Sequence, residues 1–310
     1  METSAIALQQ RLDNENLTHA QRLHIGQRLA DFGDPRPGTG VSNGLPDILW
    51  LPVAPGGEVL IQRIWRAETP DEETRVIQTE TVDVDPFHIG QFLVTQRQFQ
   101  AFVDAKDGFE QLDWWRGMPP AAQRQPLSAS RAQLSNEPRD SISWWQAVAF
   151  ARWLDHRLTG LELAHPGGAG RVRVGDDVQV RLPTEWEWQW AAQNGEEART
   201  FPWGDRKTGL ANTAEAGLGQ ATAVGVYPRG KAACGAVDMA GNLMEWCAND
   251  KANLDIVEVT SDASKALRGG DWGYDLRNAT CAYCDDEDPS RIDPLNGCRL
   301  VIGKKVKGMA

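Results

Sequence analysis

The chain lacks long apolar runs and an excess of positive charge. No apolar stretch approaches the roughly 18 residues that span a bilayer, and the N-terminal residues do not show the basic stretch and apolar core of a secretory signal. The 32 Lys and Arg are outnumbered by 43 Asp and Glu, which gives a net charge of −11. A surface of this sign repels phosphate backbones and anionic lipids. We therefore expect a cytoplasmic protein that binds neither nucleic acid nor membranes.

Cysteine is scarce and tryptophan is abundant. The five cysteines are Cys234, Cys247, Cys281, Cys284 and Cys298, an odd number without the paired spacing of zinc fingers. They indicate reduced thiols in a cytosolic protein. The 310 residues also contain 13 Trp against 3 Tyr and 8 Phe. Because Trp side chains anchor packing between loops and sheets, this excess predicts a fold with many fixed loops.

Residues 1–45 are predicted to form a helical appendage and linker. Apolar residues from Ile6 to Phe32 recur at a spacing typical of one or two short amphipathic helices, with Asn16 or Thr18 as a candidate cap. The stretch 34–44 is rich in Pro and Gly and ends this pattern. It marks a candidate domain boundary, and the alternative is a surface loop within one domain.

The second predicted domain, residues 46–310, combines short strands with few helices. Apolar or alternating residues predict strands at 48–53, 59–61, 82–84 and 87–95. Gly56-Gly57 lies between the first two, a hairpin-like pattern. The helices are predicted at Gln96–Asp104, Trp144–Arg157 and from Glu185 onward, with caps at Thr95, Ser143 and Thr184. Residues 105–140 lack periodicity and predict a long loop region that contributes to a surface.

Seven motifs stand in a fixed order along the second domain: FHIGQFLVTQRQFQAFV, SISWWQAVAFARWLDHR, RLPTEWEWQWAAQNG, FPWGD, ACGAVDMAGNLMEWC, LRGGDWG and NGCRLV. Their succession closely resembles the formylglycine-generating enzyme (sulfatase-modifying factor) family over about residues 46 to 303. The resemblance implies an α+β domain with a C-type lectin-like fold of the formylglycine-generating enzyme type. Such a domain has a small antiparallel sheet, few helices and long loops.

The resemblance does not extend to the residues that catalysis requires in the family. Catalytic members bind copper with two cysteines after the Arg-Gly-Gly turn, and the matching positions here are Tyr274 and Ala279. Copper(I) prefers sulfur ligands, which neither residue supplies. The iron-dependent sulfoxide synthases use a histidine triad in an N-terminal helical bundle, whereas this segment carries His19 and His24. We therefore predict a chain that is not an enzyme and requires no cofactor.

An enzymatic alternative stays open at this point. Cys281, Cys284 and Cys298 lie near the expected catalytic positions, though in a different register. The alternative is a copper-dependent thiol-oxidising enzyme of the formylglycine-generating family with shifted cysteines.

Catalytically silent members of the family resemble the variable proteins of diversity-generating retroelements. This resemblance implies that residues 271–301 are encoded by DNA that is replaced by a reverse-transcribed copy with errors at template adenines. Most residues of the segment are reachable from the template codon AAY, although Glu287 is not. The residues expected to vary and to bind ligand are Gly273, Tyr274, Asp275, Leu276, Arg277, Tyr283, Cys284, Asp285, Asp286, Glu287, Asp288, Ile292, Asp293, Leu295 and Asn296.

The chemistry of this segment predicts the kind of ligand. Tyr274 and Tyr283 are expected to act as rigid amphipathic contacts and Arg277 as a bidentate donor, beside an acidic patch at Asp285–Asp288. We assign Arg268, Trp272 and Arg299 to the scaffold. The sequence thus favours a non-catalytic binding protein with a diversified C-terminal loop surface. Its unknown ligand is expected to be a protein with a basic or hydrogen-bond-donating surface.

A structural calcium ion is also implied by the resemblance. Family members often hold one at the loop that matches Gly241–Glu245, where Asn242 and Glu245 are retained. The alternative is that Asn242 caps a turn and Glu245 pairs with an arginine such as Arg299. The acidic run Asp285–Asp288 is a poorer candidate, because consecutive carboxylates point in different directions.

Overall fold

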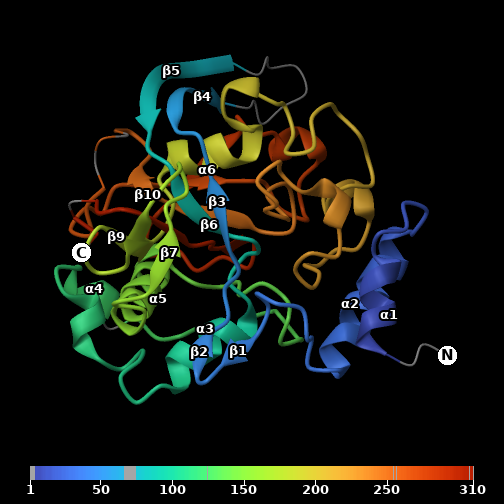
Figure 1. Ribbon diagram of the computed structural model, residues 1–310, viewed down its shortest axis with the longest axis horizontal. Helices are drawn as coiled ribbons and strands as arrows, with labels where there is room; N and C mark the ends of the chain where they lie inside the picture. Colours follow the sequence, from blue (N-terminus) through green and yellow to red (C-terminus); the bar gives the residue numbers. More distant parts are fainter. Residues whose placement is uncertain are drawn as a thin grey trace.

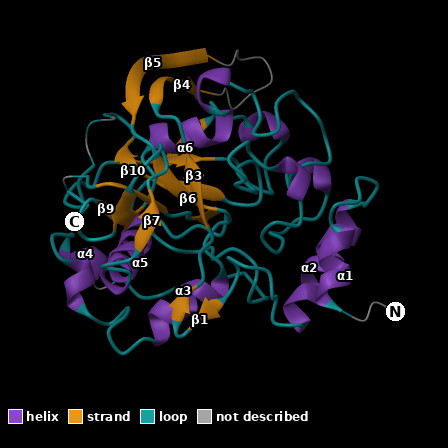
Figure 2. Cartoon of the chain, viewed as in Figure 1, coloured by secondary structure: helices purple, strands orange, loops and turns teal. Residues whose placement is uncertain are grey.

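The computed structural model describes residues 4–65, 75–123, 125–253, 255, 257–306 and 308–309. Long loops connect short helices and small sheets throughout the described chain (Figure 2). This arrangement confirms the α+β class with few helices and long loops. No described helix has the length and apolar character that crossing a membrane requires.

The helices begin where the sequence places their caps. The hydroxyl oxygens of Thr95, Ser143 and Thr184 each accept from the backbone N–H of the third residue of their helix. The side-chain oxygen of that third residue in turn accepts from the backbone N–H of the cap. Thr18 caps the second N-terminal helix in the same way. Such reciprocal bonds satisfy two backbone groups at each helix start. The helices are α1 (Ala5–Arg11), α2 (His19–Asp31), α3 (Gln96–Asp104), α4 (Pro120–Gln123), α5 (Trp144–Arg157) and α6 (Glu185–Gln193).

Two four-stranded sheets form the centre of the domain, in the orders β3-β6-β14-β9 and β12-β11-β10-β13. Their pairs are antiparallel except for β10 and β13, which are parallel. Among described residues, β1-β2, β4-β5 and β7-β8 form two-stranded sheets. The strands are β1 (Val41–Ser42), β2 (Leu45–Pro46), β3 (Trp50–Val53), β4 (Gly57–Trp65), β5 (Arg75–Val84), β6 (Phe87–Gly90), β7 (Glu162–Ala164), β8 (Arg171–Arg173), β9 (Val178–Arg181), β10 (Met244–Asp250), β11 (Lys265–Arg268), β12 (Cys284–Glu287), β13 (Asn296–Gly297) and β14 (Val301–Lys304).

Tryptophans fill the core. Trp144 and Trp153 of α5 pack with Trp246 of β10 in one cluster, and Trp188 of α6 belongs to a second. All four are almost fully buried. Their indole N–H groups bond to carbonyls or carboxylates in several cases, as when Trp144 donates to the carbonyl of Cys247 at 2.7 Å. Through such contacts Trp144 and Trp188 tie helices α5 and α6 to strand β10.

Two predicted strands differ from the structure. Residues 48–61 do not form a hairpin, because β3 pairs with β6 while β4 pairs with β5. The chain changes sheets at Gly56, where a Cβ would lie 2.2 Å from the carbonyl oxygen of Val84. The predicted strand 87–95 ends at Gly90, since the following residues turn into the cap of α3. Local alternation signals a strand but does not identify its partner.

The N-terminal helices pack against residues 223–227. Figure 1 shows α1 and α2 at one side of the molecule, beside the gold-coloured loops near residue 225. Ile25 and Leu29 of α2 are buried in a cluster with Val226 and Tyr227. The guanidinium of Arg22 donates to the carbonyl oxygens of Leu12, Asn14 and Val226 at 2.9–3.0 Å.

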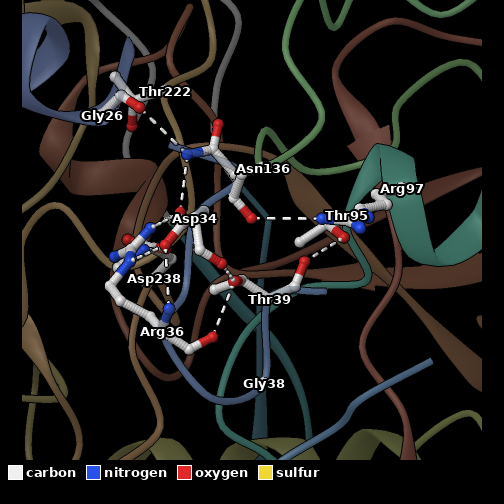
Figure 3. A network of polar contacts seen from close by, with 12 residues as sticks. Gly26, Asp34, Arg36, Gly38, Thr39, Thr95, Arg97, Asn136, Thr222 and Asp238 are labelled. Carbon is white, nitrogen blue, oxygen red and sulfur yellow. Dashed lines mark hydrogen bonds and ion pairs between the residues drawn. The ribbon is translucent and has the colours of Figure 1, made fainter. Parts of the chain in front are cut away.

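A buried polar network ties the stretch after α2 to Thr95 and Asn136 (Figure 3). Asp34 accepts hydrogen bonds from Arg36 at 2.6 Å and from the amide of Asn136 at 2.7 Å. Burial alone would raise the pKa of Asp34, but Arg36 outweighs it and holds this pKa below its usual value. The hydroxyl of Thr95 donates to the carbonyl of Thr39 at 3.0 Å. The Pro- and Gly-rich stretch is thus fixed to the domain by directional contacts.

Candidate ligand-binding surface

The C-terminal segment begins at a buried arginine. Arg268 ends β11 and forms an ion pair with Glu185 of α6 at 2.6 Å, with both side chains fully buried. It also donates to the carbonyl oxygens of Cys281 and Tyr283, at 3.2 and 3.3 Å. Arg268 therefore holds the far side of the loop through backbone carbonyl oxygens. These oxygens are present whatever side chains residues 281 and 283 carry.

A second buried arginine closes the segment. Arg299 pairs with Glu245 of β10 at 2.8 Å, and both side chains are fully buried. It also donates to the carbonyl oxygens of Gly90, Gln91 and Val237 at 2.8–2.9 Å. Arg268 and Arg299 thus hold the two ends of the segment, in keeping with their assignment to the scaffold.

The residues at the implied calcium loop do not fit a calcium ion. Both carboxylate oxygens of Glu245 accept bonds from Arg299, and one also accepts from the indole of Trp188 at 2.8 Å. The side-chain oxygen of Asn242 accepts from the backbone of Thr222 at 2.9 Å and from Asn212. These donors occupy the oxygens that calcium needs. The contacts are those of the alternative, in which Asn242 fixes a turn and Glu245 pairs with Arg299.

Between the two arginines the backbone is held from several sides. Ala214 donates to the carbonyl of Tyr274 at 2.8 Å, and the backbone N–H of Leu276 donates to the carboxylate of Glu215 at 3.0 Å. Strand β12 pairs with β11, with Cys284 opposite Arg268. Further on, Ser141 donates to the carbonyl of Asp293 at 3.2 Å. The segment is an ordered surface whose course is set largely by backbone contacts.

Most residues expected to bind ligand lie at this surface. The exposed ones are Gly273, Tyr274, Arg277, Asp286 and Asp288. The partly exposed ones are Asp275, Asp285, Glu287, Ile292, Asp293 and Leu295. The buried ones are Leu276, Tyr283, Cys284 and Asn296.

The buried residues correct part of the expected ligand surface. Tyr283, expected as an exposed aromatic contact, is 8% exposed and directs its hydroxyl to Asp285 at 3.2 Å. Leu276 packs with Ala279 in a small apolar cluster, and Cys284 packs in the cluster of Trp188. The reason is that a short 3-10 helix (Leu276–Ala279) and β12 each turn one face to the core. The sequence showed no period there, so inward and outward positions were not separated.

Carboxylates gather around Tyr274. Asp271 accepts the backbone N–H of Gly273 at 2.6 Å through one oxygen, whereas its other oxygen has no hydrogen-bond partner among described residues. Burial, together with the charges of Asp293 and Asp285, raises the pKa of Asp271 to about 6. Burial and the same three carboxylates also raise the pKa of Tyr274. Tyr274 and the carboxylates of Asp271, Asp285 and Asp293 thus form the centre of an acidic surface.

The cations of this region are already paired. Arg277 binds Asp275 at 2.6 Å, Arg291 lies 3.7 Å from Asp293, and Lys251 lies 3.6 Å from Asp286. Arg277, expected to bind ligand, therefore faces its own neighbour in this structure. Within the described chain, Asp285, Glu287 and Asp288 form no ion pair, so the surface keeps a negative charge.

The cysteines near this surface are buried thiols. Cys281 and Cys284 are at most 4% exposed, and burial raises the pKa of each to about 12. Burial likewise raises the pKa of Cys298. A protonated, inaccessible thiol is a poor nucleophile and metal ligand. Among described residues no cluster of three or more His, Cys, Asp or Glu side chains is placed to hold a metal.

The positions that match the catalytic cysteines lie in different environments. Tyr274 is 49% exposed, whereas Ala279 is 1% exposed. His19, from the N-terminal helices, lies 2.8 Å from the hydroxyl of Tyr227, while His24 is exposed on the same helix. His19 thus takes part in helix docking. Its pKa is lowered by burial and by the charge of Arg22.

Comparison with known proteins agrees with this fold. The model of the sulfatase-modifying factor enzyme 1-like domain matches residues 45–304. The chain belongs to this family. The matched range of the sulfatase-modifying factor domain agrees with the range over which its motifs resemble the formylglycine-generating enzymes.

Its relatives include proteins of different kinds. Hercynine oxygenase of Mycolicibacterium smegmatis is 26% identical over 93% of this chain and 68% of its own length. Inactive C-alpha-formylglycine-generating enzyme 2 of Mus musculus is 27% identical over 70% of this chain and 72% of its own length. The solved structure of Treponema denticola variable protein 1 superposes with a TM-score of 0.53 and 19% identity, over 81% of this chain and 94% of that one. At that identity, the superposition shows a shared fold.

Proposed function

We propose that this sulfatase-modifying factor domain is a non-catalytic ligand-binding protein whose C-terminal loop surface is diversified by a retroelement. The observation that carries the proposal is the way the segment is held. Its ends are fixed by the buried pairs Arg268–Glu185 and Arg299–Glu245, and its middle by backbone contacts. Exposed side chains such as Tyr274 contribute little to that framework, so they can change without loss of the fold.

Several observations support the absence of catalysis. Tyr274 and Ala279 stand where the catalytic cysteines are expected, and the nearby Cys281 and Cys284 are buried with raised pKa values. A relative named as an inactive formylglycine-generating enzyme and a structural neighbour named as a variable protein are compatible with this proposal.

The charge of the surface supports a protein ligand with basic groups. Exposed Tyr274 supplies a rigid aromatic contact, and the surrounding carboxylates supply acceptors for Lys and Arg side chains. Complementary charge accelerates the encounter with such a partner and disfavours acidic ones.

A peptide-display selection tests this proposal. A random library is selected on the immobilised full chain, and bound clones are then measured on the variant Tyr274→Ser, Asp286→Ser, Asp288→Ser. We expect clones enriched in Lys and Arg that lose binding to this variant. Leu112→Ser, at a residue 69% exposed outside the segment, serves as the control and should leave binding unchanged. Selections that never yield a clone dependent on the three residues would contradict the proposal.

A further inference from the structure

A cleft of about 630 Å³ lies next to the candidate ligand-binding surface that residues 271–301 form. Its walls come from the end of α2 (Gln27 and Asp31), from residues 130–140 and 219–221, and from Trp272 and Pro294 of the C-terminal segment. The volume is within the range of about 300–1,000 Å³ typical of ligand sites. The cleft therefore joins four parts of the chain that are distant in sequence.

Glu137 lies in the wall of this cleft with an acceptor left open. It is 6% exposed, and its Oε2 accepts the backbone N–H groups of Gln133 and Leu134 at 2.7 and 3.2 Å. Its Oε1 accepts no hydrogen bond from any described residue. A carboxylate held in this way, with one oxygen fixed and the other open, is prepared to accept a donor from a ligand.

The other charged groups of the cleft are mostly acidic. Asp140 is 2% exposed and accepts from the hydroxyl of Ser130 at 2.8 Å and the backbone of Arg131 at 2.9 Å. Asp31 of α2 is exposed and pairs with Arg28 at 2.7 Å. Burial, with a smaller contribution from the charge of Asp140, raises the pKa of Glu137. Arg131 is the cationic residue of the lining, and it is exposed.

We propose that this cleft receives a lysine or arginine side chain of the protein ligand, which donates to Glu137 Oε1, with α2 as one wall of the site. The inference rests on the proposed function and extends it to residues outside the C-terminal segment. The partly exposed indole of Trp272 supplies apolar surface along which the aliphatic stem of such a side chain can lie.

The proposal gives the docked N-terminal helices a role in binding. Ile25 and Leu29 of α2 pack inward, while Gln27 and Asp31 of the same helix line the cleft. Residues two apart lie on opposite sides of a helix, so one side anchors α2 and the other contributes to the site.

The test uses the ¹⁵N-labelled full chain and three short peptides. One peptide carries a single lysine flanked by glycines, one carries arginine, and one carries Nε-acetyl-lysine, which lacks the charge. We expect the first two to cause saturable shifts in the backbone amide signals of Ser130, Leu134 and Gly219. The acetyl-lysine peptide should cause none of comparable size.

Matched variants identify the acceptor. Glu137→Gln should weaken binding of the lysine peptide about tenfold, because a charge-assisted hydrogen bond is lost. Glu110→Gln makes the same change at an exposed carboxylate outside the cleft lining and should have no effect. Asp31→Lys, at an exposed position of α2, should also weaken binding and does not depend on how Glu137→Gln folds.

The outcomes separate this inference from the proposed function. Absent shifts, equal binding of the lysine and acetyl-lysine peptides, or binding that neither Glu137→Gln nor Asp31→Lys changes would overturn the inference. If display-selected peptides still required Tyr274, Asp286 and Asp288, the proposed function would stand without the cleft. If neither kind of peptide bound, both would fail.

Discussion

At the scale of single residues, the stability of the surface depends on the buried pair of Arg299 and Glu245. Because Arg299 is fully buried and makes three further bonds to carbonyls, its charge needs the carboxylate of Glu245. Removing one partner of such a pair typically costs about 3–5 kcal/mol. We expect Glu245→Gln to lower the free energy of unfolding by this amount in urea titrations.

The same variant, Glu245→Gln, distinguishes an ion pair between Glu245 and Arg299 from a calcium site at Glu245. Addition of calcium or of a chelator should leave the melting temperature of the wild-type chain unchanged, since Glu245 already binds Arg299. Glu110→Gln, at an exposed carboxylate, should change the free energy of unfolding by less than about 0.5 kcal/mol. A melting temperature that rose with calcium in the wild type and not in Glu245→Gln would contradict this account.

Asp271 makes stability depend on pH. Its pKa is raised to about 6 in the folded chain, so the folded state binds its proton more tightly than the unfolded state does. The contribution of protonated Asp271 to the free energy of unfolding is therefore complete below about pH 4, where the carboxyl of the unfolded chain is also protonated. This contribution is lost as the pH rises through about 6. We expect Asp271→Asn to be more stable than the wild type at pH 7.5 by on the order of 1–3 kcal/mol.

Urea titrations between pH 4 and 7.5 measure this difference. Asp238, whose pKa is also raised to about 6 by burial, contributes equally to both proteins and cancels in the comparison. If the difference in free energy of unfolding between Asp271→Asn and wild type does not grow with pH, Asp271 ionises normally.

At the scale of elements, the C-terminal segment separates residues that hold the fold from residues that face solvent. Tyr274, Asp286 and Asp288 are exposed, whereas Leu276 is 3% exposed and packs in an apolar cluster. We expect the triple change of the exposed residues to serine to leave the melting temperature nearly unchanged. Leu276→Ala should cost about 2–5 kcal/mol of stability. Thermal and urea unfolding check both, and a triple variant as unstable as Leu276→Ala would refute the separation.

Helix α2 depends on a close approach at Gly26. A Cβ there would lie 2.8 Å from the Cβ of Ala223, so a larger side chain would force the helix off the loop. We expect Gly26→Leu to increase hydrogen exchange across α2 while exchange in α5 stays unchanged. His24→Leu places the same side chain at an exposed position of the helix and should keep the protection of α2. Equal exchange in the two variants would argue against the close contact.

The sequence predicted where helices and strands lie better than it predicted which strands pair with one another. The caps Thr95, Ser143 and Thr184 could be predicted because a capping box involves residues three apart. The pairing of β3 with β6 could not, because the strand partners are separated by more than thirty residues in sequence. At the candidate surface, Tyr274 was predicted to be exposed and is, whereas the side chain of Tyr283 is buried in the apolar cluster that contains Trp144 and Trp246. The sequence did not indicate that Glu137 and α2 line a common cleft, because only folding brings them beside Trp272.

At the scale of the whole molecule, the family scaffold holds the loops in place and leaves the proposed variable surface exposed. Two buried arginine pairs and a Trp-rich core fix the loops, and the N-terminal helices pack against them. The residues that hold the fold are then different from the exposed residues of the proposed ligand surface, an arrangement that would allow the exposed ones to change.

Sequencing several kilobases of DNA around the gene would show whether residues 271–301 are diversified. We expect a near-copy of the stretch that encodes Asp271–Val301, beside a reverse transcriptase gene, with mismatches confined to template adenines. Those mismatches should fall on codons of exposed residues such as Tyr274, Asp286 and Asp288, and spare Arg268 and Arg299. If no such copy is present, or if its mismatches ignore adenines, the segment is an ordinary loop and the claim is wrong.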